Sequence, residues 1–236
     1  MSTFEINYGF NDVSCGDYIY AIFSGNTGKV KELLSAGQDP FERDSGGNTP
    51  FFWASFRGNA EMIQAIADAQ HQCGGIQGLE PSHVKMAIPT GRPLDADQMR
   101  RFTLLFKLVP DQQALMAAGP DLLSHAVFHG ADAEVVQFLL AAGIAPTQHR
   151  EKTGNTPLHD ACQQGRADLL KLLLETSTDA NLVNAAGESP LRSAMNAFLI
   201  SGLNEAGECV KLLIVHKARA IPPLRLTERF SLWRRH

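Results

Sequence analysis

One short stretch of the chain combines the side chains of a cysteine-dependent active site. His159, Asp160 and Cys162 lie within four consecutive positions. A nucleophilic cysteine needs a base within hydrogen-bond reach and a third group that orients this base. The alternative is structural, because a free cysteine is also a common small core residue. The choice between these two interpretations depends on the elements that hold the stretch.

Two other groups of residues have side chains that could bind a metal ion. His125 and His129 are four residues apart, a spacing at which two histidines on one helix can share a metal. His71, Cys73 and His83 surround an irregular region, but they do not have a recognised ligand spacing. No full set of ligands accompanies either group in the sequence. We therefore predict no metal site and no cofactor.

The composition is typical of a soluble, folded protein. The 236 residues are 44% hydrophobic and 19% charged, and the formal net charge is −4. This balance predicts no binding to nucleic acid and no polybasic membrane surface. The first residues lack the features of a signal peptide, and no apolar run is long enough to span a membrane. The four scattered cysteines indicate free thiols in a reducing compartment, so we expect a cytoplasmic protein.

The stretch around His159 belongs to a repeat. An alanine followed four residues later by a glycine occurs at Ala161, and the same step begins at positions 21, 54, 87 and 126. Successive alanines are 33, 33, 39 and 35 residues apart, and Ala194 follows after another 33 residues. A small residue at this point would let two helices approach closely. The glycine suits the left-handed backbone at the end of a helix.

Each repeat predicts two helices joined by a turn. An amphipathic apolar run with helical spacing follows every glycine. Three copies place a threonine or serine and then a proline before the first helix, at Pro50, Pro157 and Pro190. Proline suits the first helical turn, and the preceding hydroxyl can cap the helix.

These motifs resemble the ankyrin repeat family, whose units contain a turn, a short helix, a longer helix and a loop, with a period near 33 residues. Thr156-Pro-Leu-His159 followed by Ala161 matches the family's T-P-L-H-x-A motif, and the resemblance covers residues 17–218. It implies an all-α solenoid of about six stacked repeats. It also implies that His159 bridges neighbouring turns and that Cys162 is a core residue. We therefore predict no catalytic residue and no enzymatic activity.

Two of the predicted repeats are irregular. The repeat around Ala87 has about six extra residues after Gly91, so that Asp95 or Asp97 is expected to cap its second helix. The last repeat has an insertion, which we expect to form a lengthened first helix and a loop at 202–207. The predicted repeats are residues 17–43, 44–76, 77–115, 116–150, 151–183 and 184–218.

Both ends of the array are expected to carry caps, because the outermost units of a solenoid would otherwise expose apolar faces. We predict an N-terminal cap over residues 1–16. We expect residues 219–236 to form a short C-terminal cap with spaced apolar residues. The alternative is a free basic tail, in which Arg225–Arg235 would direct the protein to an acidic partner or a membrane.

The resemblance also implies where a partner would bind. In ankyrin repeats, the two residues before the helix-terminating glycine commonly contact a ligand on the concave face. Three copies here place a phenylalanine at the first of these positions, and exposed aromatic residues typically mark an interaction site. The alternative is that these rings point inward and fill the core. The predicted contact residues are Phe23, Ser24, Asn48, Phe56, Arg57, Phe128, His129, Lys152, Asn155, Gln163, Gln164 and Glu188.

The resemblance implies a non-enzymatic module that binds another protein through its concave face. Its role would be that of an adaptor, an inhibitor or a secreted effector, which would act in the cytoplasm of a host cell. The alternative is an enzyme, or a sensor of a small ligand or metal, built on the irregular residues 70–98. His71, Cys73, His83 and Arg92 are the candidate residues of that alternative.

Overall fold

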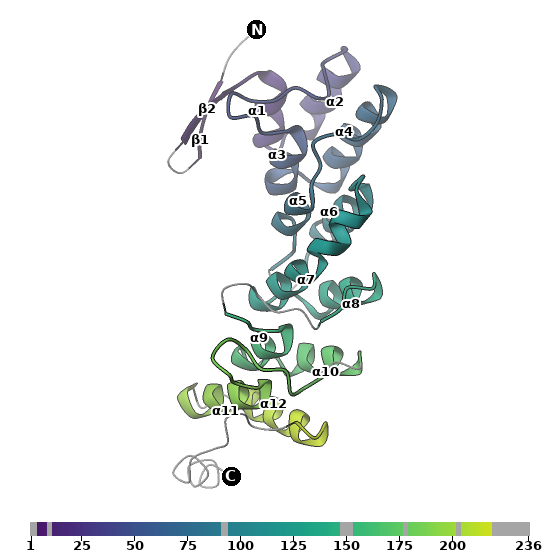
Figure 1. Cartoon of the computed structure of the whole chain (residues 1–236). Coiled ribbons are helices and arrows are strands. Elements are labelled where there is room, and N and C mark those ends of the chain that lie inside the picture. The colour runs from purple at the N-terminus through teal and green to yellow at the C-terminus, as the bar shows by residue number, and fades with distance from the viewer. Residues whose placement is uncertain are drawn as a thin grey trace. The chain divides into compact units, whose positions relative to one another are not determined.

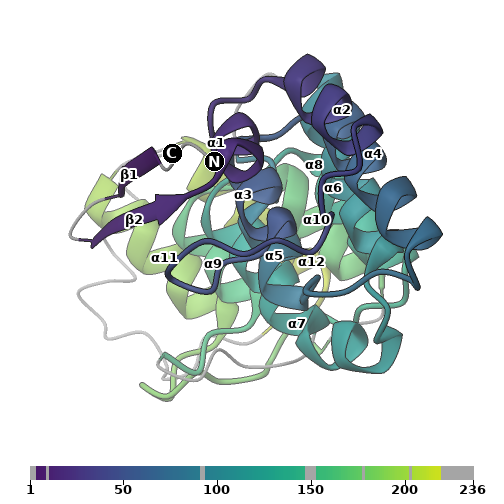
Figure 2. The same cartoon turned by 90° about the horizontal axis from the view of Figure 1, so that it is seen from above.

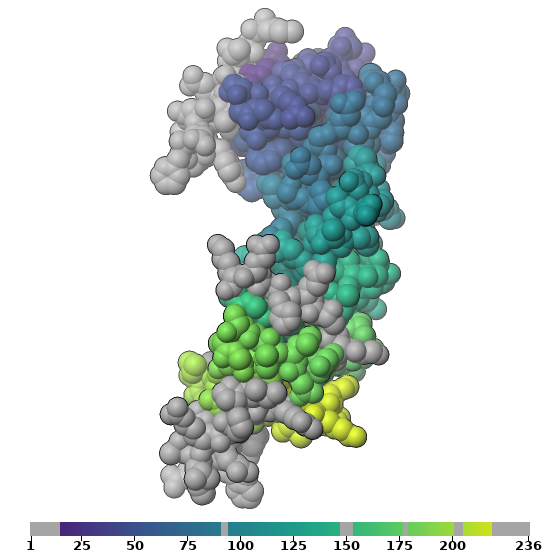
Figure 3. Space-filling view, viewed as in Figure 1, coloured from purple at the N-terminus to yellow at the C-terminus, as the bar shows by residue number. Residues whose placement is uncertain are grey.

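The computed structural model describes residues 4–8, 11–90, 94–146, 153–176, 179–201 and 204–218 (Figure 1). Side chains are described from Cys15 onward, with the same gaps and without residues 201 and 204 (Figure 3). The chain divides into two compact units, one over residues 1–89 and 93–117 and the other over 90–92 and 118–236. The C-terminal residues 219–236, predicted as a cap or a basic tail, lie outside the described residues.

The first unit contains three helix pairs in two layers (Figure 1). The first helices α1, α3 and α5 pack on one another in chain order, and the second helices α2, α4 and α6 do the same. Each second helix also contacts the first helix of its own pair. The helices are α1 (Asp17–Phe23), α2 (Thr27–Ser35), α3 (Pro50–Arg57), α4 (Ala60–Gln72), α5 (Pro81–Met86) and α6 (Ala96–Leu108).

The second unit repeats this arrangement. Helix α9 packs on α11, and α8, α10 and α12 form the second layer. Helices α9 and α11 each contact the second helix of their own pair. The helices are α7 (Gln112–Phe128), which begins within the first unit, α8 (Ala133–Ala141), α9 (Pro157–Gln163), α10 (Ala167–Glu175), α11 (Pro190–Ser201) and α12 (Asn204–Val215). Stacked helix pairs confirm the predicted class of helical repeat fold.

A β-hairpin precedes the first helix and was not part of the all-α prediction. Strands β1 (Phe4–Tyr8) and β2 (Asn11–Cys15) pair antiparallel, with Phe4 opposite Cys15. Both strands contact α1, and they lie beside it in Figures 1 and 2. The alternation of apolar and polar residues in Phe4–Tyr8 is a strand signal that a search for helical periodicity overlooks. The capping role of residues 1–16 stays a prediction.

The core lies between the two helix layers of each unit. The repeat alanines Ala21, Ala54, Ala161 and Ala194 are buried, which confirms that a small residue is needed where helices approach closely. Each fully buried large aliphatic side chain contributes about 1.5–3 kcal/mol to the free energy of unfolding. The second helices supply many of these side chains, which include Val30, Met62, Ile63, Ile66, Leu105, Leu169, Leu170 and Leu173.

The glycine that ends the first helix has the predicted left-handed backbone in three of the four repeats whose glycine is described. Gly25, Gly130 and Gly165 have φ values of 74°, 72° and 67°. Gly58 is different, because its φ is −75°, and the prediction of a left-handed backbone is wrong there. A Cβ atom on Gly58 would lie only 2.6 Å from the carbonyl oxygen of Ala54. Glycine at this position therefore serves close packing and not backbone handedness.

The third repeat has a different register from the predicted one. In regular repeats the buried alanine lies four residues after the helix-starting proline, as Ala161 follows Pro157. Helix α5 starts at Pro81, and Ala87 is its C-cap residue. The predicted position of Ala87 inside the first helix is therefore wrong by two residues. The predicted cap of the second helix is confirmed, because the side chain of Asp95 accepts a hydrogen bond from the backbone N–H of Asp97 at 3.3 Å.

Two later elements also differ from expectation. Helix α7 starts at Gln112 and includes Pro120, so it begins before the predicted fourth repeat. Helix α11 has 12 residues against seven in α9, which confirms the lengthened first helix of the last repeat. Helix α12 starts at Asn204, so the loop predicted at 202–207 is wrong for its last four positions. Residues 202–203 lie outside the described residues.

Candidate functional site

The predicted contact pairs lie at the C-terminal ends of the first helices. In the first unit, Phe23 and Ser24 end α1, and Phe56 and Arg57 end α3. In the second unit, the pairs at the ends of α7 and α9 are Phe128 with His129 and Gln163 with Gln164. Phe56 is 36% exposed and Phe128 is 40% exposed, so neither ring fills the core. Phe23 is half-buried, and the second residue of each pair is exposed.

Three aromatic residues and one arginine gather on the first unit. The guanidinium carbon of Arg57 lies 5.4 Å from the centroid of the Phe23 ring and 5.1 Å from that of Phe56. Both distances are within the range of a cation–π interaction. Tyr20 lies three residues before Phe23 on α1, hence on the same side of this helix, and is 38% exposed. We call Tyr20, Phe23, Phe56 and Arg57 the aromatic face.

A buried tryptophan supports the aromatic face from behind. Trp53 is 1% exposed, and its ring packs edge-to-face on Phe23 with a centroid distance of 5.3 Å. Its Nε1–H donates a hydrogen bond to Oδ2 of Asp44 at 2.8 Å. The amide of Asn48 donates to the same carboxylate at 2.8 Å. The predicted contact residue Asn48 is therefore half-buried and holds the turn before α3.

The second unit presents a smaller exposed group. The rings of Phe128 and His129 meet edge-to-face at a centroid distance of 5.1 Å. The ring centroids of His129 and His125 are 4.2 Å apart. The side-chain amide of Gln164 donates a hydrogen bond to the carbonyl oxygen of Phe128. This bond joins α9 to the preceding repeat. In the described part of the chain, no group of three or more histidine, cysteine or acidic residues could hold a metal ion.

Asn155 and Glu188, two further predicted contact residues, also have hydrogen bonds within the second unit. Asn155 is 5% exposed, and its amide donates to Oδ1 of Asp160 at 3.0 Å and accepts from Asn184 at 3.0 Å. This burial disagrees with the prediction that Asn155 is available to a partner. The carboxylate of Glu188 accepts from the amide of Asn196 at 3.1 Å. Lys152 lies outside the described residues.

The possible catalytic cluster is built into the repeat interface. Nδ1 of His159 accepts the backbone N–H of Thr156 at 3.1 Å, so its Nε2–H donates to the carbonyl oxygen of Glu188 at 2.8 Å. Cys162 is fully buried beside Cys209, and burial raises the pKa of its thiol well above the usual value. A cysteine held as a buried thiol is a poor nucleophile. The bridging role predicted for His159 is confirmed.

His83 holds the same structural position in the irregular repeat. Its Nδ1 accepts the backbone N–H of Glu80 at 2.9 Å, as Nδ1 of His159 accepts that of Thr156. His83 is 7% exposed, whereas His71 and Cys73 lie exposed near the end of α4. Arg92 lies outside the described residues. The three described positions, His71, Cys73 and His83, do not form a group that could hold a metal ion.

His83 also predicts acid sensitivity of the first unit. Burial lowers the pKa of His83 below the usual 6.5, although the nearby Glu80 opposes this shift. As the pH falls through about 6.5, the unfolded chain therefore binds a proton before the folded chain does. The free energy of unfolding is expected to be highest above this pH and to decrease below it. Urea unfolding between about pH 7.5 and 5.5 should show a weaker pH dependence in His83→Gln. An NMR titration that gives His83 a pKa of 6.5 or more would contradict this prediction.

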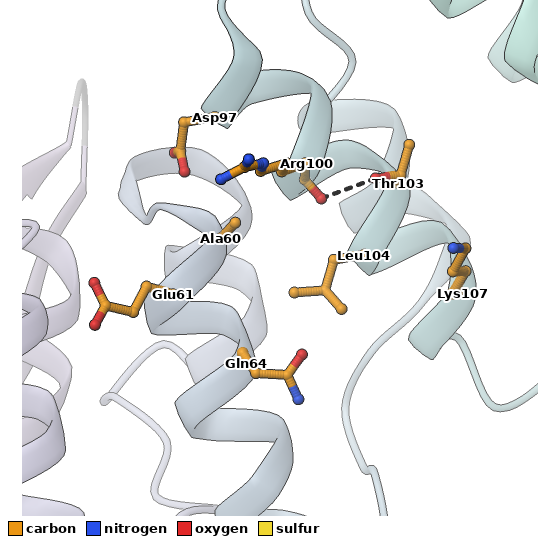
Figure 4. Close-up of a pocket in the computed structure, with 8 residues that line it drawn as sticks. All are labelled: Ala60, Glu61, Gln64, Asp97, Arg100, Thr103, Leu104 and Lys107. Carbon is orange, nitrogen blue, oxygen red and sulfur yellow. Dashed lines mark hydrogen bonds between the residues drawn. The ribbon is translucent and has the colours of Figure 1, made fainter.

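A shallow groove of about 520 Å³ lies between α4 and α6 in the first unit (Figure 4). Six of its eight lining residues are polar or charged, and they carry both signs of charge, whereas ligand pockets are usually apolar and enclosed. None of His71, Cys73 and His83 lines it, so it gives no support to a sensor built on those residues. The lining residues are Ala60, Glu61, Gln64, Asp97, Arg100, Thr103, Leu104 and Lys107.

Comparisons with known proteins agree with this geometry. Two family models, ankyrin repeats (many copies) and ankyrin repeats (3 copies), match residues 18–66 and 123–222, and together they span more than half of the chain. The chain belongs to the ankyrin repeat family. Ankyrin repeats are generally protein–protein interaction modules. No helix in the described ranges is both long enough and apolar enough to cross a membrane.

Similar ankyrin repeat proteins are mostly much longer than this chain. The E3 ubiquitin-protein ligase KEG of Arabidopsis thaliana is 26% identical over 202 residues, which are 81% of this chain and 12% of that protein. Rabankyrin-5 of Homo sapiens is 28% identical over 172 residues, which are 65% of this chain and 14% of that protein. The chain thus spans less than a sixth of either relative.

Solved ankyrin repeat structures share the fold. The ankyrin repeat domain of Bcl-3, a member of the IkappaB protein family, has a TM-score of 0.64 at 19% identity and covers 87% of each chain. An ankyrin repeat domain from Acinetobacter baumannii has a TM-score of 0.61 at 20% identity. This match covers 86% of the present chain and 98% of the Acinetobacter chain. At these identities the likeness shows the fold alone.

Proposed function

We propose that this ankyrin repeat protein is a non-enzymatic module that binds another protein in the cytoplasm, as an adaptor, an inhibitor or an effector. The observation that carries the proposal is the aromatic face of the first unit. Phe56 is exposed at the end of α3, and Tyr20 is exposed in the middle of the adjacent first helix α1. In a soluble fold, exposed aromatic side chains beside one another generally mark an interaction surface.

The construction of the face supports this proposal. Phe23 rests on Trp53, which a hydrogen bond fixes to Asp44, and Arg57 is held against two rings. Side chains that are already ordered lose little conformational entropy when a partner binds. Aromatic and arginine residues also dominate the binding energy at protein interfaces. The face therefore combines suitable chemistry with a preformed geometry.

Phe56→Ser tests the proposal, with Met116→Ser as its matched control. Met116 is 38% exposed and lies on α7 within the first unit, so both changes remove a similarly exposed apolar side chain. We expect Phe56→Ser to weaken partner binding about 10- to 100-fold, as for an aromatic hot spot, and Met116→Ser to leave it unchanged. Affinity capture with quantitative mass spectrometry measures the loss, and thermal unfolding checks the fold. Equal capture by both variants would contradict the proposal.

A further inference from the structure

The positive charge of Arg57 is exposed, and in the described part of the protein it is not paired with a carboxylate. Its guanidinium carbon lies 5.4 Å from the centroid of the Phe23 ring and 5.1 Å from that of the Phe56 ring. Within the described residues, no carboxylate forms an ion pair with Arg57. Helix α3 contains no acidic residue, and the only one in α1 is Asp17 in its first turn.

A stacked guanidinium still has strong hydrogen-bond donors. Its N–H groups lie in the plane of the group and match the two oxygens of a carboxylate. Such charge-assisted pairs are roughly twice as strong as neutral hydrogen bonds. Since Arg57 is exposed and already lies against two rings, it can donate hydrogen bonds to a carboxylate without first being ordered.

The surroundings of Arg57 restrict what can carry this carboxylate. The chain has a formal net charge of −4, so it has no general attraction for acidic molecules. Attraction for an acid must therefore arise locally, at the arginine. Phe56 lies beside it with an exposed ring, and Tyr20 adds a second exposed ring on α1, so that an apolar group beside the acid is favoured.

We propose that the aromatic face anchors a partner polypeptide by an acidic residue next to an apolar residue. The carboxylate pairs with the guanidinium of Arg57, and the apolar side chain lies on the rings of Tyr20 and Phe56. This inference rests on the proposed function and adds the chemistry of the bound segment. It assigns Arg57 as the residue that selects for charge and the rings as the residues that supply apolar contact.

Selection from a phage-displayed library of random short peptides on the full chain tests the inference. Recovered peptides are then titrated by fluorescence polarisation against the wild type and against variants of the aromatic face and of a control position. The variants are Arg57→Gln, Arg57→Lys, Tyr20→Ser, Phe56→Ser and Arg100→Gln. Arg100 is the matched control, because it is an exposed arginine on α6 of the same unit. Thermal unfolding checks that each variant is folded.

We expect the recovered peptides to share an acidic residue adjacent to an apolar one. Arg57→Gln should weaken binding about 10- to 100-fold, Arg57→Lys about 3- to 10-fold, and Arg100→Gln not at all. Amidation of the peptide's acidic residue should cause the same loss in the wild type and no further loss in Arg57→Gln.

The alternative results separate this inference from the proposed function. Peptides that require Tyr20 and Phe56 but bind Arg57→Gln as tightly as the wild type would overturn the inference and leave the proposed function intact. Peptides that bind Tyr20→Ser and Phe56→Ser with unchanged affinity would overturn both. Recovery of no peptide that depends on the aromatic face would also overturn both.

Discussion

Replacement of Trp53 by alanine is expected to lower the free energy of unfolding of the first unit by about 3–5 kcal/mol. The side chain is 1% exposed, so its removal leaves a large cavity between α1 and α3. The change also removes one of the hydrogen bonds that the buried carboxylate of Asp44 accepts, and Asp44 is itself 6% exposed. Urea unfolding followed by circular dichroism measures the loss.

Two further variants help to explain this loss. One is a different change at Trp53, and the other is a change at the exposed Phe56. Trp53→Phe keeps an aromatic ring but removes the hydrogen bond from Trp53 to Asp44. It should therefore lower the free energy of unfolding by about 1–3 kcal/mol. Phe56→Ala removes a ring from the exposed surface, and its cost should be about 1 kcal/mol or less. If Phe56→Ala destabilised the unit as much as Trp53→Ala, the ring of Phe56 would be a core residue and not part of a binding face.

The second large effect is expected at Gly154, before α9. Its φ is +64°, and an added Cβ would lie 2.4 Å from the backbone nitrogen of Ala185 in the next repeat. This nitrogen donates a hydrogen bond to the carbonyl oxygen of Thr153 at 3.1 Å, which brings the two turns together. Gly154→Ala places a side chain on a left-handed backbone and overpacks the contact with Ala185. It should therefore lower the free energy of unfolding of the second unit by about 2–4 kcal/mol.

Gly47→Ala is the matched control for Gly154→Ala. Gly47 has a similar φ of +78°, but nothing lies within 4 Å of a Cβ added there. Gly47→Ala should therefore lower the free energy of unfolding only by the strain of the left-handed backbone, about 1 kcal/mol. Chemical unfolding of the two variants gives the comparison. Equal losses would show that backbone strain alone matters and that the turns of adjacent repeats do not touch closely at Gly154.

The regular repeats could be predicted from the sequence because their determinants are local. The proline that starts α9, the buried Ala161 and the left-handed Gly165 act within one repeat. The role of His159 followed from the family resemblance, since its partner Glu188 lies in the next turn. The irregular third repeat was misread because the step from Ala87 to Gly91 copies the regular spacing by chance. Pro81 and His83 define its register, and their spacing equals that of Pro157 and His159.

The candidate site could be predicted only in part. The exposed positions of Phe56 and Phe128 followed from their place before the glycine. Tyr20 was missed, although its spacing of three residues from Phe23 could have identified it. The burial of Asn155 depends on Asn184, which is 29 positions further along the chain. Such contacts between turns arise from the stacking of repeats and leave no local pattern in the sequence.

Site-specific photo-crosslinking shows whether the aromatic face contacts the partner. The photoreactive amino acid p-benzoylphenylalanine replaces Phe56 on the aromatic face in one variant and Met116 on α7 in the other, and both chains are irradiated with the partner present. We expect a crosslinked protein at position 56, its loss when Arg57 is changed to Gln, and no crosslink at position 116. A crosslink at position 116 with none at position 56 would contradict the claim that the aromatic face binds the partner.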